Sequence, residues 1–429
     1  MKPVLEITDF SVAYRSPSGE KDVRAVDQVS LSLYPGEVVG LAGESGSGKS
    51  TLAYGSCRLL RPPAVITGGS VRYNGQRSGF SSMDVLQLDG EGLRQLRWRE
   101  IAIVFQSAMN ALNPVLSIRA QLTDAIHAHM DMSRSDADDK AASLLDLVGI
   151  PRSRLRGFPH QLSGGMRQRV MIAMALATDP EVIIMDEPTT ALDVVVQRDI
   201  LAQIAELRER LGFAILFITH DLSLLLELAD RIAVMYAGRL LETGTSRELH
   251  YEPAHPYTRG LLNSFPSLHG PRRELAGIPG SPPDPRNLPP GCPFLPRCGY
   301  GTSACEEVDM SLLPVTGSDD PEHRTACPFV GPDTPAPEVV ETEARSLWSR
   351  RRPRRLAARS RWRRPASART SRSAAVRSCT RSATSRSACT RAPWWRWSER
   401  AGLASQPSPG YSRGRNARPR AASSSTAPR

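Results

Sequence analysis

The chain has 429 residues, seven cysteines and a formal net charge of +11. The charge is uneven, because residues 345–429 contain 23 Arg, no Lys and one acidic residue, Glu399, which leaves residues 1–344 with a net charge of −11. A folded basic face for nucleic acid is therefore not expected. No apolar run reaches the roughly 18–20 residues that span a bilayer, and the N-terminus has no signal-peptide core, so we expect a cytoplasmic chain.

Residues 1–250 alternate strand-like and helix-like stretches, which is typical of an α/β fold with a mainly parallel sheet and crossover helices. The predicted strands are Val38–Leu41, Ile101–Phe105, Val182–Met185, Ala214–Ile218 and Ile232–Tyr236. Helices are expected after Lys49, after Ser163 and after Gln197. Residues 107–160 are more helical and predict an inserted helical subdomain within the unit 1–250.

A glycine-rich loop follows the first of these strands and fits the pattern G-x-x-x-x-G-K-[ST]. Its glycines allow backbone N–H groups to turn inward around phosphate oxygens at a helix N-terminus. Lys49 would reach the β- and γ-phosphates, and the Ser50 hydroxyl would ligate Mg²⁺. The residues predicted to bind nucleotide here are Gly43, Ser45, Gly46, Ser47, Gly48, Lys49, Ser50 and Thr51.

Two adjacent carboxylates, Asp186 and Glu187, follow the apolar run Val182–Met185. Adjacent carboxylates at the end of a buried strand are unfavourable unless a cation is near. The run and its two carboxylates are similar to a Walker B motif. This resemblance implies that Asp186 would hold Mg²⁺ through water and that Glu187 would polarise the water that attacks the γ-phosphate, a positioning role typical of phosphoryl transfer. A solvated strand end is the alternative interpretation.

The stretch Leu162–Arg169 resembles the signature motif of ABC (ATP-binding cassette) ATPases, which contacts the ATP held by a partner domain. The same residues also read as a helix start with Ser163 as its N-cap. The resemblance implies a P-loop NTPase cassette with a mixed-sheet core, and a composite site to which Ser163, Gly164 and Gly165 contribute. It also implies a second ABC cassette as partner.

Four further residues fall in the order of that family. Gln106 resembles the Q-loop glutamine, which senses the γ-phosphate and Mg²⁺ and leads to the transporter-contacting subdomain. Asp193, at the end of Thr190–Asp193, resembles the D-loop aspartate, and His220 resembles the switch histidine that contacts the γ-phosphate. Tyr14 matches the aromatic residue that stacks on adenine. The catalytic residues implied are Glu187, His220, Gln106 and Lys49, with Ser50, Gln106 and Asp186 at Mg²⁺.

Several longer segments are similar to the ATPase subunits of oligopeptide, dipeptide and nickel importers. These segments are Phe105–Pro114, Phe158–Gln161, Met166–Leu176, Asp186–Val194 and His255–Thr258. The resemblance covers residues 1–335 and implies an ATPase that drives peptide uptake, docked on two membrane permease subunits that receive substrate from a binding protein. Gln161 stands where many members carry an acidic residue, a departure that should not affect hydrolysis.

Residues 251–335 form a Pro- and Cys-rich C-terminal segment that contains four of the cysteines, Cys292, Cys298, Cys305 and Cys327. In a reducing cytosol such a cluster favours a metal over disulfides. Structural zinc sites use closer cysteine pairs, whereas four thiolates at looser spacing suit an iron–sulfur cluster. Related importer ATPases carry a [4Fe–4S] cluster in this segment. Inert cysteines are the alternative.

Residues 336–429 are interpreted as a linker followed by a disordered Arg-rich tail, since large aliphatic residues are scarce. Back-translated and read one nucleotide earlier, Trp394–Pro407 can spell V-V-A-L-V-G-E-S-G-S-G-K-S-T, close to Val38–Thr51. We therefore predict that a frameshift before about residue 381 has replaced a second fused cassette. A genuine basic tail that binds RNA or anionic lipid is the alternative. The DNA sequence decides between them.

The resemblance thus implies an ATP- and Mg²⁺-dependent ATPase at the cytoplasmic face of the membrane, energising the import of di- and oligopeptides without binding nucleic acid. A nickel or other small-solute importer and a soluble ABC protein that acts on ribosomes or DNA remain alternatives. The solute cannot be read from the sequence, because selectivity resides in the permeases and the binding protein.

Overall fold

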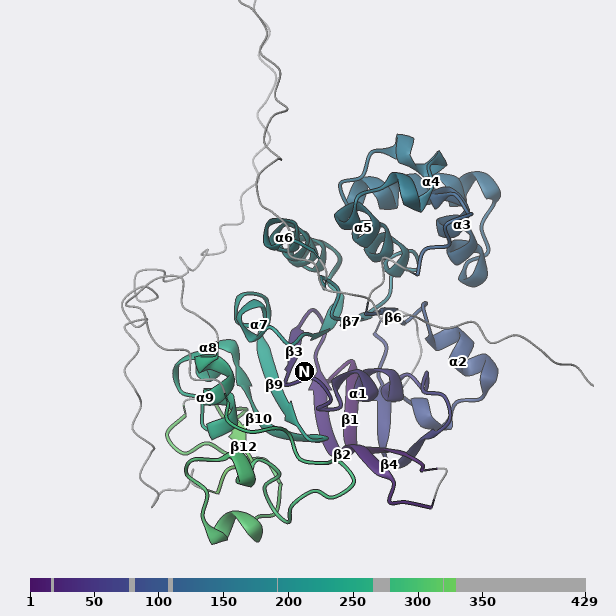
Figure 1. Cartoon of the computed structure of the whole chain (residues 1–429). Coiled ribbons are helices and arrows are strands. Elements are labelled where there is room, and N and C mark those ends of the chain that lie inside the picture. The colour runs from purple at the N-terminus through teal and green to yellow at the C-terminus, as the bar shows by residue number, and fades with distance from the viewer. Residues whose placement is uncertain are drawn as a thin grey trace, which may run out of the picture. The chain divides into compact units, whose positions relative to one another are not determined.

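A computed structural model describes residues 1–16, 19–76, 82–106, 111–190, 192–264, 278–318 and 320–328 (Figure 1). The Arg-rich tail, Cys379, Cys389 and the predicted frameshift lie outside these residues, as do Ser107 and Ala191 within two predicted motifs. Among the described helices, none combines the length and the apolar character that a bilayer crossing requires.

The larger sheet of the described part has the strand order β11-β12-β10-β9-β3-β8-β7-β6. The run from β9 to β6 is parallel, whereas β10, β12 and β11 extend it in antiparallel fashion. The strands are β3 (Val38–Ala42), β6 (Ile101–Val104), β7 (Val182–Asp186), β8 (Ala214–Ile218), β9 (Arg231–Tyr236), β10 (Arg239–Thr245), β11 (Leu313–Pro314) and β12 (Arg324–Thr325). All five predicted strands are confirmed to within one residue at each end.

The expectation of a mainly parallel sheet is wrong for the first part of the chain, which forms a separate antiparallel sheet in the order β2-β1-β4-β5. Its strands are β1 (Leu5–Tyr14), β2 (Val23–Leu33), β4 (Ala64–Tyr73) and β5 (Met83–Asp84). The connection between β1 and β2 is shorter than the dozen or so residues that a parallel crossover requires. These two strands therefore pair as an antiparallel hairpin.

The parallel strands are buried on both faces, as expected for a sheet covered by other layers. Along β3, Val38 and Ala42 belong to the hydrophobic cluster on one face, whereas Val39 and Leu41 belong to the cluster on the other. This division follows from the two-residue period of a strand. One cluster joins the sheet to the helices, and the other joins it to the antiparallel sheet.

Helices of the described part are α1 (Lys49–Ser56), α2 (Gly90–Leu96), α3 (Ile118–His129), α4 (Arg134–Leu147), α5 (Gly164–Ala175), α6 (Val194–Leu211), α7 (Leu222–Leu228), α8 (Ser246–Tyr251) and α9 (Pro256–Asn263). The helix expected after Gln197 begins earlier, at Val194. Asp193 is its N-cap and accepts a hydrogen bond from the Val196 N–H at 3.0 Å, so the helix starts where an aspartate satisfies a free backbone donor.

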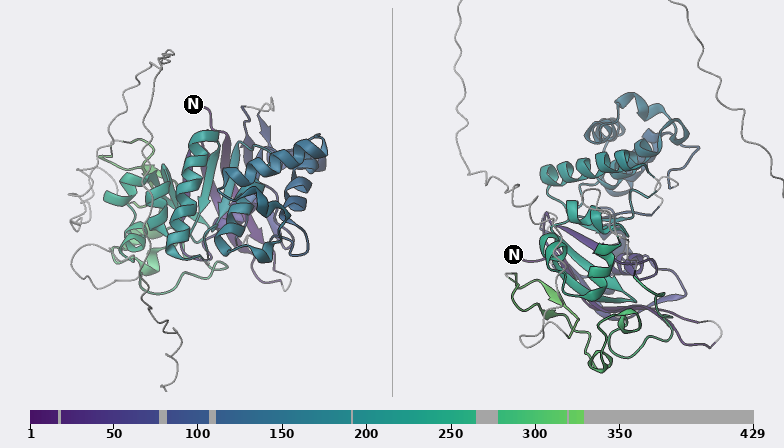
Figure 2. Two further views of the ribbon diagram at one scale, coloured as in Figure 1. Left: turned by 90° about the horizontal axis from the view of Figure 1, so that it is seen from above. Right: turned by 60° about the vertical axis from the view of Figure 1, so that its left-hand side comes forward.

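Helices α3, α4 and α5 gather on one side of the larger sheet (Figures 1 and 2). Ser117 caps α3 and Ser133 caps α4 through their hydroxyls. The short 3₁₀ helices η3 (Arg152–Arg156) and η4 (Pro159–Gln161) lead from α4 to the start of α5. In the described part of the region 107–160, all regular secondary structure is therefore helical.

The C-terminal segment adds its two short strands to the cassette sheet. Glu242 of β10 pairs with Thr325 of β12, and β12 pairs in turn with β11. Among the described residues between α9 and these strands, regular structure is limited to η5 (Leu295–Arg297) and η6 (Ser303–Glu306), as the prolines predict. The segment is thus built onto the sheet edge formed by β10.

Candidate nucleotide site

The loop between β3 and α1 has a backbone that only glycine accommodates at two positions. Gly43 has φ +147° and Gly48 has φ +102°. A Cβ atom at Gly43 would lie 2.1 Å from the Met235 carbonyl oxygen, and one at Gly48 would lie 2.1 Å from the Ala25 carbonyl oxygen. The loop therefore packs closely against Met235 and Ala25 of neighbouring strands, which fixes its path. Lys49, the first residue of α1, follows the loop directly.

The Lys49 side chain is buried inside this loop. Its ammonium donates hydrogen bonds to the carbonyl oxygens of Gly43 at 2.7 Å and Glu44 at 2.9 Å, and to the Ser47 hydroxyl at 3.3 Å. Burial lowers the pKa of Lys49, although the carboxylates of Glu187, Asp186 and Glu44 oppose that change. The lysine thus places a positive charge at a helix N-terminus, where anions are already favoured.

Asp186 is the last residue of β7, and its carboxylate is almost wholly buried. Tyr54 donates a hydrogen bond of 2.6 Å to Oδ2, whereas Oδ1 is buried with no hydrogen-bond partner among the described residues. A buried, unpartnered carboxylate oxygen is costly. Mg²⁺ or one of its water ligands would satisfy Oδ1, so the residues present fit the predicted metal.

Glu187 gathers three side chains that the sequence predicts only separately. Gln106 donates a hydrogen bond from Nε2 at 2.9 Å, the His220 Nδ1 lies 3.1 Å away, and the Thr190 hydroxyl donates at 3.1 Å. The residue adopts φ +46°, an uncommon conformation for a side chain larger than glycine. Its N–H donates to the Ile218 carbonyl oxygen at 2.9 Å, which holds that turn. The Glu187 carboxylate is therefore oriented by side chains from the segments that follow β6, β7 and β8.

Ser163 is the N-cap of α5, as predicted, and its exposed hydroxyl accepts a hydrogen bond from the Met166 N–H at 3.3 Å. Next to it, a Cβ atom at Gly165 would lie 2.6 Å from Cγ1 of Val196. Gly165 therefore lets α5 approach the start of α6, where Asp193 lies exposed. In the described part, no hydrogen bond connects these residues to the loop Gly43–Thr51 of the same chain.

Tyr14 lies beside the P-loop, and its hydroxyl is 3.3 Å from Oγ1 of Thr51. The remaining predicted loop residues differ in accessibility. Ser45 and Gly46 are exposed, Ser50 is half-buried, and Ser47 is buried. The exposed backbone of Ser45 and Gly46 is open to a ligand from solvent, whereas the Ser47 hydroxyl serves the loop itself.

Comparison with known proteins matches this arrangement. The family model described as ABC transporter matches residues 26–190, and the model described as oligopeptide/dipeptide transporter, C-terminal region, matches residues 241–305. A putative peptide import ATP-binding protein of Brucella abortus is 43% identical over 340 residues, which cover 79% of this chain and 97% of that protein. The chain belongs to the ABC transporter family of ATP-binding proteins.

Two further comparisons agree with this assignment. The oligopeptide transport ATP-binding protein OppD of Salmonella typhimurium is 43% identical over 307 residues, covering 71% of this chain and 89% of that protein. The solved structure of cbiO1 from Clostridium perfringens, part of the ABC transporter complex cbiONQ, superposes with a TM-score of 0.50 at 26% identity, covering 59% of this chain and 92% of that one. The chain is an ABC ATPase, and its ligands are ATP and Mg²⁺.

Sequence reasoning missed three residues that contact the predicted phosphate-binding loop or the predicted Mg²⁺ ligand Asp186. Tyr54 contacts Asp186, Tyr257 accepts a hydrogen bond from the Glu44 N–H at 2.9 Å, and Arg297 forms an ion pair with Glu44 at 2.7 Å. Tyr54 lies four residues after Ser50 and so on the same helix face, a signal that the sequence contains. Tyr257 and Arg297 are far from the loop in sequence and carry no such signal.

All four cysteines of the C-terminal segment lie among the described residues, where Cys292, Cys305 and Cys327 are buried and Cys298 is partly exposed. The described residues contain no group of three or more His, Cys, Asp or Glu side chains that could hold a metal ion. Burial raises the pKa of Cys292 to about 11 and also raises that of Cys298, which disfavours the thiolates that metals need. Cys57 is buried in the core, as predicted.

A buried polar network lies beside these cysteines. Glu242 is fully buried, and its carboxylate accepts hydrogen bonds from the N–H groups of Ala254 at 2.7 Å and His255 at 2.9 Å and lies 2.9 Å from the His323 Nε2. His255 in turn accepts from the Tyr257 N–H at 3.0 Å through Nδ1 and caps α9. The His255–Thr258 motif thus caps a helix whose tyrosine reaches the P-loop.

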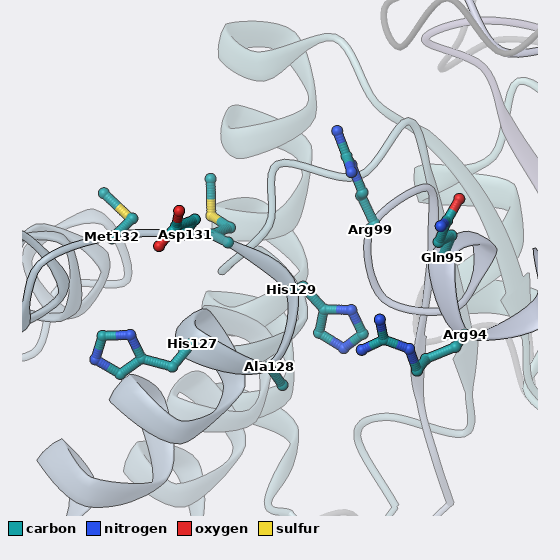
Figure 3. A pocket seen from close by; sticks show the side chains of 9 residues that line it. Arg94, Gln95, Arg99, His127, Ala128, His129, Asp131 and Met132 are labelled. Atoms are coloured by element: carbon teal, nitrogen blue, oxygen red, sulfur yellow. The ribbon is translucent and has the colours of Figure 1, made fainter. Parts of the chain in front are cut away.

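A pocket of about 360 Å³ lies between α2 and the end of α3 (Figure 3). Its lining includes Arg94, Arg99, His127 and His129. Burial lowers the pKa of His129, and the two arginines lower it further. Arg94 is already paired with the Glu91 carboxylate at 2.9 Å. None of the residues that line this pocket belongs to the predicted nucleotide site.

Proposed function

We propose that this chain is the ATP-hydrolysing subunit of an importer for di- and oligopeptides. The convergence of Gln106 and His220 on Glu187 is the observation that carries the ATPase part of the proposal. The peptide part is supported by the C-terminal match to residues 241–305 and by the 43% identity to proteins named for peptide import.

In this proposal Glu187 orients the attacking water and draws its proton, because its carboxylate is held by neighbours that leave it half-buried. His220 and Gln106 hold that carboxylate and contact the γ-phosphate, and Lys49 neutralises the phosphate oxygens. Mg²⁺ would be held by Ser50, Gln106 and Asp186, and when bound it would offset negative charge on the phosphates. Tyr14 would stack on adenine, and residues Gly43–Thr51 would enclose the phosphates.

The exposed signature residues support a site shared between two cassettes. Ser163 and Asp193 are exposed, and their side chains accept hydrogen bonds from the Met166 and Val196 N–H groups at the start of their own helices. We propose that Ser163, Gly164, Gly165 and Asp193 complete the nucleotide site of a second ABC cassette, supplied by another copy of this chain or by a different chain. ATP turnover per chain should therefore rise with chain concentration.

The partners follow from this assignment. We propose that the cassette docks on two permease subunits at the cytoplasmic face of the membrane and receives its transport signal from a substrate-binding protein through those subunits. The net charge of −11 on residues 1–344 gives no support for nucleic acid as a partner. The resident ligands of the site are ATP and Mg²⁺.

The iron–sulfur cluster remains a separate proposal that rests on the number and spacing of the four cysteines. Anaerobic purification of the full chain, followed by iron and sulfide assays, tests it. Near-stoichiometric iron and sulfide that disappear when Cys292 and Cys305 are replaced would support a cluster. A colourless protein without iron would leave the thiols as packing residues.

The proposed function is tested by isolating the full chain with its membrane partners and reconstituting the complex in vesicles. We expect ATP hydrolysis to rise several-fold when binding protein and a di- or oligopeptide are present together. Stimulation of ATP hydrolysis by Ni²⁺ in place of peptide would indicate that the chain serves a metal importer. Cosedimentation with ribosomes, without any permease, would overturn the transport assignment.

A further inference from the structure

Glu44 is the second residue of the phosphate-binding loop, and its side chain is held by the C-terminal segment. Arg297 Nη1 donates to Glu44 Oε2 at 2.7 Å, and Nη2 donates to Oε1 at 3.1 Å. The two residues are 253 positions apart in sequence. A guanidinium that meets both oxygens of one carboxylate fixes its orientation as well as its position.

Arg297 is itself held on every side. Its Nε donates to the Pro279 carbonyl oxygen at 2.7 Å, Nη1 also donates to the Tyr236 hydroxyl at 3.1 Å, and Nη2 also donates to the Ile278 carbonyl oxygen at 3.4 Å. Its guanidinium lies 5.9 Å from the centre of the Phe294 ring. Only 5% of the side chain is exposed. All five donors of the guanidinium therefore have acceptors, and the group has little freedom to follow Glu44 if the loop moves.

The backbone of Glu44 makes one hydrogen bond to Tyr257 of the C-terminal segment and another to Lys49. Its N–H donates to the Tyr257 hydroxyl of α9 at 2.9 Å, and its carbonyl oxygen accepts from the Lys49 ammonium at 2.9 Å. Tyr257 packs against Tyr236 with ring centres 4.6 Å apart. Anything that displaces Glu44 therefore also displaces an acceptor of the lysine that meets the phosphates.

We propose that Arg297 is a positioning residue of the ATP site, which acts through Glu44 to hold the phosphate-binding loop in its ligand-ready form. The C-terminal segment is then part of the nucleotide-binding unit in addition to any role it has in transport. Without Arg297, the free phosphate-binding loop samples more conformations, and restricting them costs free energy when ATP binds. In addition, the Glu44 carboxylate no longer has its arginine partner and repels the phosphates. Both effects weaken ATP binding and leave the reacting groups at Glu187 unchanged.

The test uses the full chain with Arg297→Ala, Arg297→Lys and a matched control, Arg231→Ala. Arg231 forms a similarly buried ion pair with Glu37, at 3.1 Å, but Glu37 precedes β3 whereas the phosphate-binding loop follows it. We expect Arg297→Ala to raise the Kd for a fluorescent ATP analogue and the KM for ATP about ten-fold, the size of a lost charge-assisted hydrogen bond. The kcat at saturating ATP should change less than about two-fold, and Arg231→Ala should leave the Kd unchanged.

A double-mutant cycle with Glu44→Ala separates positioning from a purely structural role. If Arg297 acts through Glu44, the effect of Arg297→Ala on the Kd should fall below about two-fold in the Glu44→Ala background. Arg297→Lys keeps the charge without the fork and should restore part of the affinity, and it carries the test if Arg297→Ala does not fold. An unchanged Kd in Arg297→Ala, or in Arg297→Lys in that case, overturns the proposal. So does a full effect that persists without Glu44.

Discussion

The Tyr54 hydroxyl donates a 2.6 Å hydrogen bond to Asp186 Oδ2 and thereby joins α1, the helix that follows the phosphate-binding loop, to β7, the strand that ends in Asp186. The Tyr54 ring also packs against Phe105, with ring centres 5.5 Å apart. Phe105 is the residue that precedes Gln106 in the sequence. Burial raises the pKa of Tyr54, and the bond to Asp186 raises it further, so the hydroxyl remains a donor. Tyr54, which lies on α1, therefore contacts residues of two other motifs, Asp186 and Phe105.

Replacing Tyr54 by Phe should destabilise the chain most when Mg²⁺ and ATP are absent. Both Asp186 oxygens would then be buried without a partner, which should lower the free energy of unfolding by about 1–3 kcal/mol. Mg²⁺ with ATP would satisfy part of that carboxylate and narrow the difference, as measured by urea unfolding with and without the ligand. Tyr73→Phe is the control. It loses the bond to Glu100, which is 2.7 Å in length and outside the site, so its deficit should be the same in both conditions.

Replacing Glu187 by Gln should reduce kcat by about 10²-fold or more and leave ATP affinity largely intact. The amide keeps the shape of the carboxylate, and with it the neighbours Gln106 and His220, but it cannot accept the proton of the attacking water. Phosphate release under saturating ATP gives kcat, and equilibrium nucleotide binding gives the affinity. Retained turnover would show that the water is activated by another group.

Replacing Gly165 by Ala should strain the contact between α5 and α6, because the new Cβ atom would lie 2.6 Å from Val196 Cγ1. Overpacking of this kind costs about 1–3 kcal/mol. Val196→Ala in the same chain should restore most of the stability, which thermal unfolding would reveal. Gly68→Ala, where a Cβ atom meets nothing within 4 Å, is the control and should be neutral. Equal losses in the two single variants would contradict the steric account.

His255 should make the fold less stable in mild acid. Burial lowers its pKa from 6.5 to about 4, although the charge of Glu242 opposes that change. Between about pH 6.5 and pH 4, His255 is therefore protonated in the unfolded chain and neutral in the folded chain. The contribution of neutral His255 to the free energy of unfolding is complete above pH 6.5. It is lost as the pH falls toward 4 and amounts to about 3 kcal/mol in total.

His255→Asn offers a way to isolate this titration. Asparagine caps helices well, so α9 should keep its start while the titrating group is removed. Unfolding measured across this pH range should show a flatter profile in the variant than in the unchanged chain. His323 works in the opposite direction, because the bond to Glu242 and nearby carboxylates raise its pKa despite burial. A profile unaltered by the substitution would assign the acid sensitivity to other groups.

The nucleotide motifs were predictable because each is local. The strand Val182–Asp186 is an apolar run with a polar end, and Ser163 and Asp193 cap helices through neighbours only three residues away. The antiparallel sheet was missed because the alternation of strand-like and helix-like stretches in residues 1–250 was taken to indicate one mainly parallel sheet, and that alternation does not show how β1, β2 and β4 pair. Arg297 was missed for a different reason. Its partner depends on how the chain after β10 folds back to the loop, and no local periodicity records that path.

The fully buried Glu242 carboxylate has a consequence for how this polypeptide is inherited. β10, which carries Glu242, is part of the cassette, whereas the groups within hydrogen-bond distance of the Glu242 carboxylate belong to residues 254, 255 and 323. A recombination event that exchanged the last part of the gene would leave a charge in the interior without donors, at a cost of several kcal/mol. Cassette and C-terminal segment should therefore descend together, and hybrids joined near residue 250 should be recovered only when both parents supply the matching donors.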